Sequence, residues 1–215
     1  GGDKKYEAER ILLEKIQKNL DNDIPVRAMQ FDEDEAKMAA ELFLLTAKPV
    51  IYAANIGEDD LGKDTSELPL VCKVKKIAES EGAETLVISA KIEEEIASLD
   101  DDEQQAFIDE LKLGESGLAK LVKACYRLLG LISYLTAGPK EVRAWTITEG
   151  TRAPQAAGKI HSDFEKGFIR AEVIKYDDYI KYGSEAAVKE AGKLGVEGKE
   201  YVVQDGDIMH FRFNV

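Results

Sequence analysis

The sequence predicts an α/β part followed by a smaller α+β module. Two short apolar runs, 50–54 and 84–89, are separated by a segment with helical periodicity. Amphipathic helical segments lie on both sides of them, and from residue 132 onward short β-like runs alternate with glycine. A strand, a helix and a strand at this spacing form a βαβ unit with parallel strands. We therefore expect an α/β fold class joined to an α+β one.

The composition is that of an ordinary folded protein with an excess of acid. The chain has 215 residues, is 44% apolar and 7% aromatic, and has a formal charge of −13, which excludes a disordered chain and a disulfide-stapled miniprotein. Residues 1–143 carry 19 basic and 30 acidic side chains, and residues 144–215 carry 10 and 12. This charge excludes broad wrapping of nucleic acid by the whole surface. An anionic partner is expected on the second part.

The cysteines and the hydropathy indicate a cytoplasmic protein. Cys72 and Cys125 lie in apolar helical segments without a C-x-x-C partner, which predicts reduced core thiols. Gly1 and Gly2 are followed by charged residues and not by the apolar run of a signal peptide. The most hydrophobic stretch, 118–135, contains three basic residues and predicts no membrane span. We expect a cytoplasmic monomer with no membrane partner.

The elements of the first part follow from local patterns. Residues 4–20 carry apolar side chains at a spacing of four, which predicts an amphipathic helix. Asp32 and Glu35 form a capping-box pattern that opens a second helix extending to about Ala47, with Phe43 on its apolar face. The runs 50–54 and 84–89 are expected to be strands buried on both faces of a parallel sheet. Further helices are expected at 67–80, 92–113 and 118–129.

The second part predicts a compact module of about 70 residues, a size at which domains fold alone. Candidate strands are 142–148, 168–174 and 208–213, and helical stretches are expected near 154–158, 176–182 and 185–191.

Chemically informative residues follow both predicted parallel strands. Asn55 and Glu58 come after the first strand, and Ser89, Ala90 and Lys91 end the second. In an open α/β sheet, ligands bind outside the carboxyl ends of the strands. The two loops are therefore expected to face one pocket.

An Asn followed three residues later by an acid, with Ser-Ala-Lys after the next strand, is the spacing by which P-loop GTPases hold a purine base. Asn55 is predicted to brace the loop and to reach the base, and Ile56 to pack against the base. Glu58 is predicted to face the Watson–Crick edge of the base, and the Ala90 N–H to meet its exocyclic position. Ser89 and Lys91 are predicted to close the pocket. Glu58 stands where a shorter Asp is usual, which weakens selectivity for guanine and makes adenine a candidate. A turn-and-cap role for Asn55 is the alternative.

The sequence lacks the other parts of a nucleotide hydrolase. It contains neither the G-x-x-x-x-G-K-[ST] phosphate loop nor D-x-x-G for the metal and the attacking water. The acidic run 100–103 lacks the spacing of a calcium loop and predicts a helix N-terminus instead. Two histidines and two distant cysteines form no metal-ligand set. We expect half of a base pocket, with no catalytic residues and no metal site.

Several segments together resemble one family. The runs 45–55, 58–61, 89–91, 136–145 and 150–173 are similar to the YchF (Obg-like ATPase) family of P-loop NTPases. The resemblance covers essentially the whole chain and is most specific in the last 85 or so residues.

The resemblance implies the remnant of a parallel P-loop NTPase sheet with a helical arm, followed by a β-grasp TGS domain. The implied domains are an arm remnant at 1–47, the C-terminal part of the G domain at 48–130, and a TGS domain with its linker at 131–215. Intact members are implied to hydrolyse ATP or GTP with Mg²⁺ and to associate with the ribosome. The chain is expected to be a fragment of such a protein, and a naturally shortened homologue is the alternative. By itself, this chain is expected to bind no cofactor and to hydrolyse no nucleotide.

The second part also carries a group of cations. Lys159, His161, Lys166 and Arg170 are candidates for contact with RNA phosphate, and Phe164 or Phe168 could supply a stacking surface. The alternative is a solvated charged loop with its aromatic rings in the core. His210 is interpreted as a satisfied histidine and not as a ligand. A non-catalytic RNA- or protein-binding TGS module is the alternative function for the whole chain.

Overall fold

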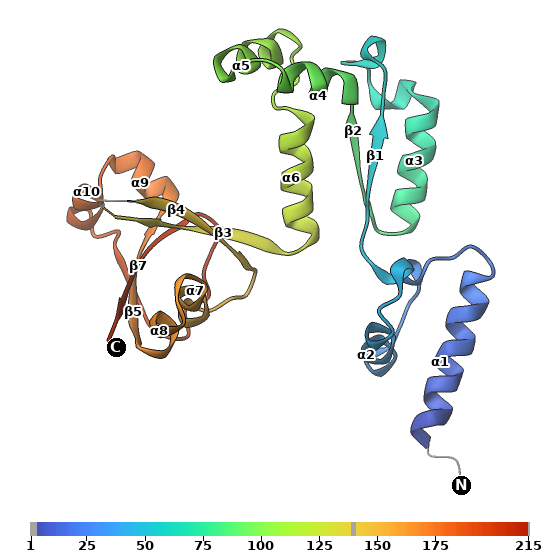
Figure 1. Ribbon diagram of the computed structural model, residues 1–215, viewed down its shortest axis with the longest axis horizontal. Coiled ribbons are helices and arrows are strands. Elements are labelled where there is room, and N and C mark those ends of the chain that lie inside the picture. Colours follow the sequence, from blue (N-terminus) through green and yellow to red (C-terminus); the bar gives the residue numbers. More distant parts are fainter. Residues whose placement is uncertain (1–3, 139–140, 215) are drawn as a thin grey trace. The chain divides into compact units, whose positions relative to one another are not determined.

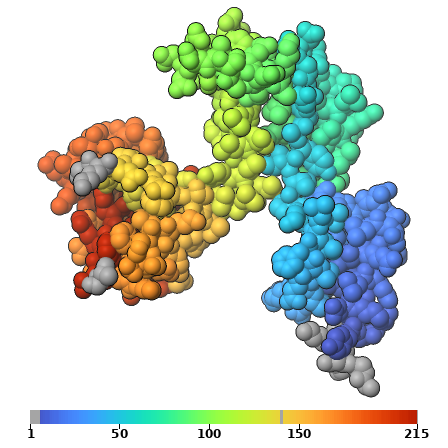
Figure 2. All heavy atoms as spheres, viewed as in Figure 1, coloured from blue at the N-terminus to red at the C-terminus, as the bar shows by residue number. Residues whose placement is uncertain are grey.

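The computed structural model describes residues 4–138 and 141–214. The chain forms two compact units, Gly1–Cys125 and Tyr126–Val215, and the boundary falls inside helix α6 (Gly117–Leu128). The helices and strands of both units are labelled in Figure 1. Figure 2 shows the atoms of the second unit as spheres, in yellow to red. Each unit contains buried hydrophobic clusters of its own.

The first unit begins with two packed helices, α1 (Lys4–Leu20) and α2 (Glu33–Glu41). Leu12 and Ile16 of α1 are buried in one cluster with Val26 and Ala39. Val26 belongs to the short 3-10 helix η1 (Val26–Ala28) between them. The predicted helix at 4–20 is confirmed, since the apolar residues at a spacing of four form the face that packs.

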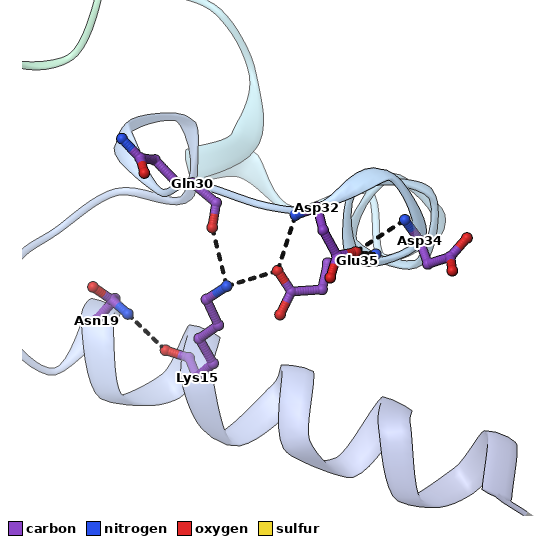
Figure 3. Close-up of polar contacts among 6 residues, drawn as sticks. All are labelled: Lys15, Asn19, Gln30, Asp32, Asp34 and Glu35. Carbon is purple, nitrogen blue, oxygen red and sulfur yellow. Dashed lines mark hydrogen bonds and ion pairs between the residues drawn. The ribbon is translucent and has the colours of Figure 1, made fainter.

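Polar contacts fix the start of α2 against α1 (Figure 3). The Asp32 carboxylate accepts the Glu35 N–H at 2.8 Å, and Glu35 Oε2 accepts the Asp32 N–H at 3.1 Å, which completes the predicted capping box. Lys15 Nζ on α1 donates to the same Glu35 oxygen at 2.7 Å and to the Gln30 carbonyl at 3.0 Å. One side chain of α1 thus joins both the cap and the connection before it.

The predicted end of α2 was wrong. The helix ends at Glu41 instead of about Ala47, and Leu45–Ala47 form the separate 3-10 helix η2. Phe43 has φ +49°, in the left-handed region that side chains adopt only at some cost. This residue interrupts the helix and points its ring outward, 85% exposed, so it is not part of the apolar face.

The βαβ unit has the predicted order. Strand β1 (Ile51–Asn55) and strand β2 (Glu84–Ile88) pair in parallel and are joined through α3 (Pro69–Ser80), with the short helices η3 (Glu58–Asp60) and η4 (Thr65–Glu67) before it. The expected burial on both faces was wrong: β2 is half-buried along its length and Ala53 of β1 is exposed. The described sheet has only these two strands, so their apolar faces are incompletely covered.

A polar cluster links η1 to this sheet. Glu81, after α3, accepts from Arg27 Nε and from the Tyr52 hydroxyl, each at 2.8 Å with the same oxygen. Arg27 also donates to the Thr46 carbonyl at 3.2 Å. The Arg27 and Glu81 side chains are 18% and 11% exposed. These contacts hold the pKa of Glu81 below its usual value although burial opposes the shift.

The helical segment expected at 92–113 is divided in two, α4 (Ala90–Ala97) and α5 (Asp101–Glu110). The Glu93 carboxylate of α4 accepts the Gly117 N–H at 2.6 Å and the Leu118 N–H at 2.9 Å. These are amides of the first turn of α6, which otherwise lack partners within the helix. A residue 24 positions earlier therefore caps α6.

The second unit is built on a five-stranded mixed sheet in the order β4-β3-β7-β5-β6. Its strands are β3 (Leu131–Ala137), β4 (Val142–Thr148), β5 (Phe168–Lys175), β6 (Gly195–Glu197) and β7 (Asp207–Phe213). β3 and β7 are parallel and the other neighbours are antiparallel. The helices are α7 (Ala153–Ile160), α8 (Ser162–Lys166), α9 (Tyr176–Tyr182) and α10 (Glu185–Glu190).

The predicted strands at 142–148, 168–174 and 208–213 are confirmed as β4, β5 and β7. β3, β6 and α8 were missed. The main core of the unit contains Tyr134 and Met209, both fully buried. The Tyr134 hydroxyl donates to the Ala156 carbonyl at 2.8 Å, and burial raises the pKa of this hydroxyl. The sheet and α7 therefore share a satisfied buried contact.

A buried carboxylate organises the start of β7. Asp207 is fully buried and accepts from Lys175 Nζ at 2.6 Å, the Tyr201 hydroxyl at 2.7 Å and the Gln204 N–H at 2.9 Å. Three donors satisfy the carboxylate, so its burial is accounted for by this network.

Both cysteines are free thiols, as predicted, but each is half-buried, so their expected place in the core was wrong. Cys72 Sγ lies 3.3 Å from the Thr65 carbonyl. Within residues 4–138 and 141–214, no helix is long and apolar enough to cross a membrane.

Candidate functional site

The loops after β1 and β2 are held together by a side-chain contact. Asn55 is the last residue of β1, and its Oδ1 accepts the Ala90 N–H at 2.9 Å. The Ile56 N–H donates to the Ile88 carbonyl at 2.9 Å, which extends the parallel pairing by one bond. The carboxyl ends of both strands and the first residue of α4 therefore form one local structure.

Ser89 directly precedes Ala90 and is the N-cap of α4. It is 4% exposed, and its Oγ has no hydrogen-bond partner among the described residues. Its carbonyl accepts the Glu93 N–H at 3.0 Å and so starts α4. A buried hydroxyl without a partner costs about 1–3 kcal/mol.

The outer side of the site is charged. Glu58, the first residue of η3, forms an ion pair with Lys91, the second residue of α4. The two side chains are 39% and 67% exposed. The hydrogen bond and the charge of Glu58 raise the pKa of Lys91. The pair joins the two loops a second time and compensates the carboxylate charge.

The structure brings the six predicted base-site residues together at the carboxyl ends of β1 and β2. Glu58 contacts Lys91, Ser89 directly before Ala90 is buried, and Ile56 is half-buried. The Ala90 N–H was expected to meet the exocyclic position of the base, but here it donates to Asn55 and so braces the loop instead. A cavity of about 600 Å³ adjoins the site. It lies against α4 and the start of α6 and is lined by Ala90 but by none of the other five residues.

The cations of the second unit are less tightly grouped. His161 lies in the one-residue connection between α7 and α8. Its Nδ1 accepts the Asp163 N–H at 3.2 Å and lies 3.4 Å from the Asp163 carboxylate. Lys159 and Lys166 are exposed. Lys159 lines a groove beside β4, whereas His161 caps α8.

Aromatic and arginine side chains refine this surface. Phe168 is 5% exposed and belongs to the core, so its expected role as a stacking surface was wrong. Phe164 is half-buried and stacks on Phe213 with ring centroids 3.8 Å apart. Arg170 and Arg212 both contact Glu172, at 3.6 and 2.9 Å. The sequence reading missed Arg212, whose only signal was its place in the last predicted strand.

His210 agrees with its interpretation as a satisfied histidine, because its Nε2 lies 2.9 Å from Glu185 Oε1. In the parts of the chain that the structure describes, no group of three or more His, Cys, Asp or Glu side chains is arranged to hold a metal ion. The acidic run at 100–103 forms the start of α5.

Comparisons with known proteins give consistent matches. Residues 131–214 match the family model YchF-GTPase_C, described as a protein of unknown function (DUF933). The chain is 52% identical over 204 residues to "Ribosome-binding ATPase YchF" of Bacillus subtilis (strain 168), covering 95% of this chain and 56% of that protein. It is 43% identical over 216 residues to "Obg-like ATPase 1" of Rattus norvegicus, covering 100% of this chain and 54% of that protein.

Solved structures show the same likeness. The Schizosaccharomyces pombe YchF GTPase matches with a TM-score of 0.83 and 40% identity, covering 97% of this chain and 55% of that one. A GTP binding protein from Pyrococcus horikoshii OT3 matches with a TM-score of 0.52, 94% coverage of this chain and 56% of that one, at 19% identity, which shows a similar fold alone. The chain spans a little over half the length of the relatives that it matches.

Proposed function

The chain belongs to the YchF/Obg-like ATPase family, and we propose that it is the base-recognition part of a ribosome-associated purine nucleotide-binding NTPase. In the intact protein, ATP or GTP with Mg²⁺ is bound and hydrolysed in the cytoplasm, and this chain alone is not catalytic. The proposal extends to this chain what the names of its relatives say of them, "Ribosome-binding ATPase" and "Obg-like ATPase".

The observation that carries the proposal is the hydrogen bond from the Ala90 N–H to Asn55 Oδ1. It joins the carboxyl ends of two neighbouring parallel strands, where α/β sheets bind their ligands. The bond uses the Asn55 oxygen as an acceptor, and we propose that the amide nitrogen of the same side chain donates to the base.

We propose that the site favours adenine over guanine. Guanine recognition needs a carboxylate that accepts both the N1 and the N2 protons of the base. Glu58 already accepts from Lys91, so its charge is compensated and one acceptor direction is used. Adenine does not require a carboxylate that accepts two protons, so the ion pair lowers the affinity of the site for adenine less than its affinity for guanine.

The described residues do not fit the phosphates or Mg²⁺. They contain no cluster of metal-binding side chains, and the printed sequence contains no phosphate-loop motif. The proposed role of this chain is therefore to bind and orient the base. No step of hydrolysis is assigned to its residues.

We further propose the division into an arm remnant at 1–47, a G-domain part at 48–130 and a TGS domain of β-grasp type at 131–215. The family-model match at 131–214 supports the last boundary. The packing of α1 on α2 supports an arm that is distinct from the βαβ unit.

RNA contact is proposed for the second unit through Lys159, His161, Lys166 and Arg170. Lys166 and Arg170 are exposed, and Arg170 and Arg212 share the single carboxylate of Glu172, which leaves a net positive charge there. Phosphate contacts of this kind supply much of the affinity for RNA and make it depend on salt.

The base site is tested in a longer protein that joins this chain to the phosphate-loop half of a family member. Asn55→Ala is expected to weaken ATP binding about tenfold, the equivalent of ~1.4 kcal/mol, when measured by calorimetry. Asn22→Ala, in the exposed turn after α1, is the matched control and should leave the affinity unchanged. Glu58→Asp should raise the affinity for GTP relative to ATP. Equal affinities for Asn55→Ala and the parent would contradict the proposal.

Hydrolysis and ribosome binding are tested on the 215-residue chain. Measurable hydrolysis by this chain would contradict its non-catalytic role. Lys166→Ala with Arg170→Ala should weaken ribosome co-sedimentation and flatten its salt dependence, whereas Lys193→Ala should not. Ribosome binding without any nucleotide effect in the longer protein would favour the alternative, a non-catalytic RNA- or protein-binding TGS module.

A further inference from the structure

Strand β4 lies at an edge of the five-stranded sheet, and β3 is its only partner among the described strands. Two hydrogen bonds flank their ladder, from the Glu149 N–H to the Gly130 carbonyl at 2.7 Å and from the Gly138 N–H to the Glu141 carbonyl at 2.9 Å. Antiparallel strands alternate between hydrogen-bonded and non-bonded pairs. The odd-numbered residues of β4 therefore direct their backbone groups toward β3.

The even-numbered residues of β4 direct their backbone groups the other way. Val142, Ala144 and Thr146 present N–H and C=O groups to the free edge, and no described residue forms a backbone hydrogen bond with them there. The groups recur every second residue, which is the spacing at which an added strand pairs.

The two edges of the sheet differ in how they are protected. Natural sheets blunt an edge by keeping it short, charged or bulged. β6, at one edge, has three residues and ends in Glu197. β4 has seven residues, pairs with β3 without a bulge and carries no charge over residues 144–148. The β4 edge therefore has the properties that allow another strand to add.

A groove of about 690 Å³ runs along this edge between β4 and α7. Residues 143–148 of β4 all line it, together with Gln155, Gly158 and Lys159 of α7. A groove over one face of a strand would be lined by alternate residues, because successive side chains point to opposite faces. Consecutive residues of β4 line this groove, together with Leu131 of β3 at one end, so the groove includes the backbone edge of β4.

The charges of the groove favour an acidic occupant. The Arg143 guanidinium lies 4.2 Å from the centre of the Trp145 ring, and its contact with Glu141 is long, at 4.0 Å. Lys159 faces the groove from α7, and the described lining contains no carboxylate. Two cations in a groove of a chain with net charge −13 complement a negatively charged ligand.

We propose that the β4 edge and α7 form a docking groove for an extended acidic peptide, which adds to the sheet as a sixth strand. Its backbone pairs with Ala144 and Thr146, and its carboxylates reach Arg143 and Lys159. Strand addition beside a helix is a recurring mode of peptide recognition. The row of alternating donors and acceptors matches a peptide backbone and not a sugar–phosphate backbone, which favours a peptide over single-stranded RNA.

The proposal is tested on the 215-residue chain with peptides selected from a random ten-residue phage-displayed library. The enriched peptide is synthesised and titrated by fluorescence anisotropy. It should be acidic, and Ala144→Pro should weaken its binding at least tenfold. The Ala144 N–H faces the free edge, where proline is tolerated, so pairing with β3 is kept. Ala144→Thr retains the N–H and is the matched control, with unchanged affinity expected.

Two further measurements keep the test independent of the folding of the proline variant. N-methylation of alternate peptide amides should abolish binding to the unaltered chain, and hydrogen exchange should slow at Ala144 and Thr146 in the complex. Arg143→Glu should lower the affinity of the chain for the acidic peptide at least threefold.

The proposal would be overturned if the library yielded no enriched peptide, or if the N-methylated peptide bound as tightly as the unmodified one. It would also be overturned if a ten-nucleotide single-stranded RNA, and not the peptide, slowed hydrogen exchange at Ala144 and Thr146. A dimer of this chain that Ala144→Pro dissociates would assign the edge to a second copy instead.

Discussion

Removing Arg27 should destabilise the first unit by leaving a covered carboxylate without its cation. Arg27 and Tyr52 both donate to one Glu81 oxygen at 2.8 Å, and the Arg27 and Glu81 side chains are 18% and 11% exposed. Breaking a fully buried ion pair costs about 3–5 kcal/mol, and an exposed pair is worth about 0–1 kcal/mol. This pair is covered but shallow, so we expect Arg27→Ala to cost about 2 kcal/mol, between those limits.

The assay is urea unfolding followed by two signals. Trp145 is the single tryptophan and belongs to the second unit, so its fluorescence reports that unit, whereas far-ultraviolet circular dichroism reports both. Arg27→Ala should lower the midpoint of the circular dichroism transition and leave the tryptophan transition in place. Arg10→Ala, which removes exposed pairs with Glu7 and Glu14, is the control and should shift neither signal.

A double-mutant cycle shows whether the uncompensated charge is the cause. Adding Glu81→Gln to Arg27→Ala removes the carboxylate charge, so the double variant should be less destabilised than the sum of the single variants. Additive effects would refute the reasoning, and so would an Arg27→Ala midpoint equal to that of the parent or an equal shift of the tryptophan transition.

Acid should remove the same contribution, because the pKa of Glu81 is lowered in the folded state from its ordinary 4.5. Its stabilisation is present above pH 4.5 and is lost as the pH falls through the lowered value. The difference in urea midpoint between the parent and Arg27→Ala should therefore persist at neutral pH and shrink as the pH falls below 4.5. Gly117→Ala should destabilise by about 1–2 kcal/mol, the usual cost of a lost helix cap, because its Cβ would lie 2.8 Å from the Glu93 oxygen that caps α6. Gly198→Ala, where nothing lies within 4 Å and φ is not positive, is the control in thermal unfolding, and equal Tm values for the two variants would contradict the steric reason.

Local signals predicted the elements that depend on neighbours in sequence. Asp32 and Glu35 are three residues apart, and their capping box is present as expected. The helix at 4–20 and the strand at 142–148 have the expected bounds. The predicted end of α2 was wrong at Phe43, because its apolar side chain fits a helix face whereas its backbone has a positive φ.

The missed elements depend on distant partners. β3 follows an apolar helix with only a glycine turn between them, so its periodicity was not separable from that of the helix. β6 has three residues, and it forms because Gly195, Val196 and Glu197 pair with β5. The caps and ion pairs formed by Glu93 and Glu81 join residues 24 or more positions apart, and no local pattern indicates them.

The two candidate sites differ in the same way. The base site was predictable because each of its loops follows a strand, and parallel pairing places the carboxyl ends of neighbouring strands together wherever the strands lie in the sheet. The β4 groove was not predictable from the sequence, because a strand becomes an edge strand only through the order of the whole sheet. That order depends on the pairing of β3 with β7, which lie more than 70 residues apart. The residues of β4 have the same sequence pattern in a central strand as in an edge strand. Its exposed backbone, and with it the proposed peptide groove, therefore follows from topology.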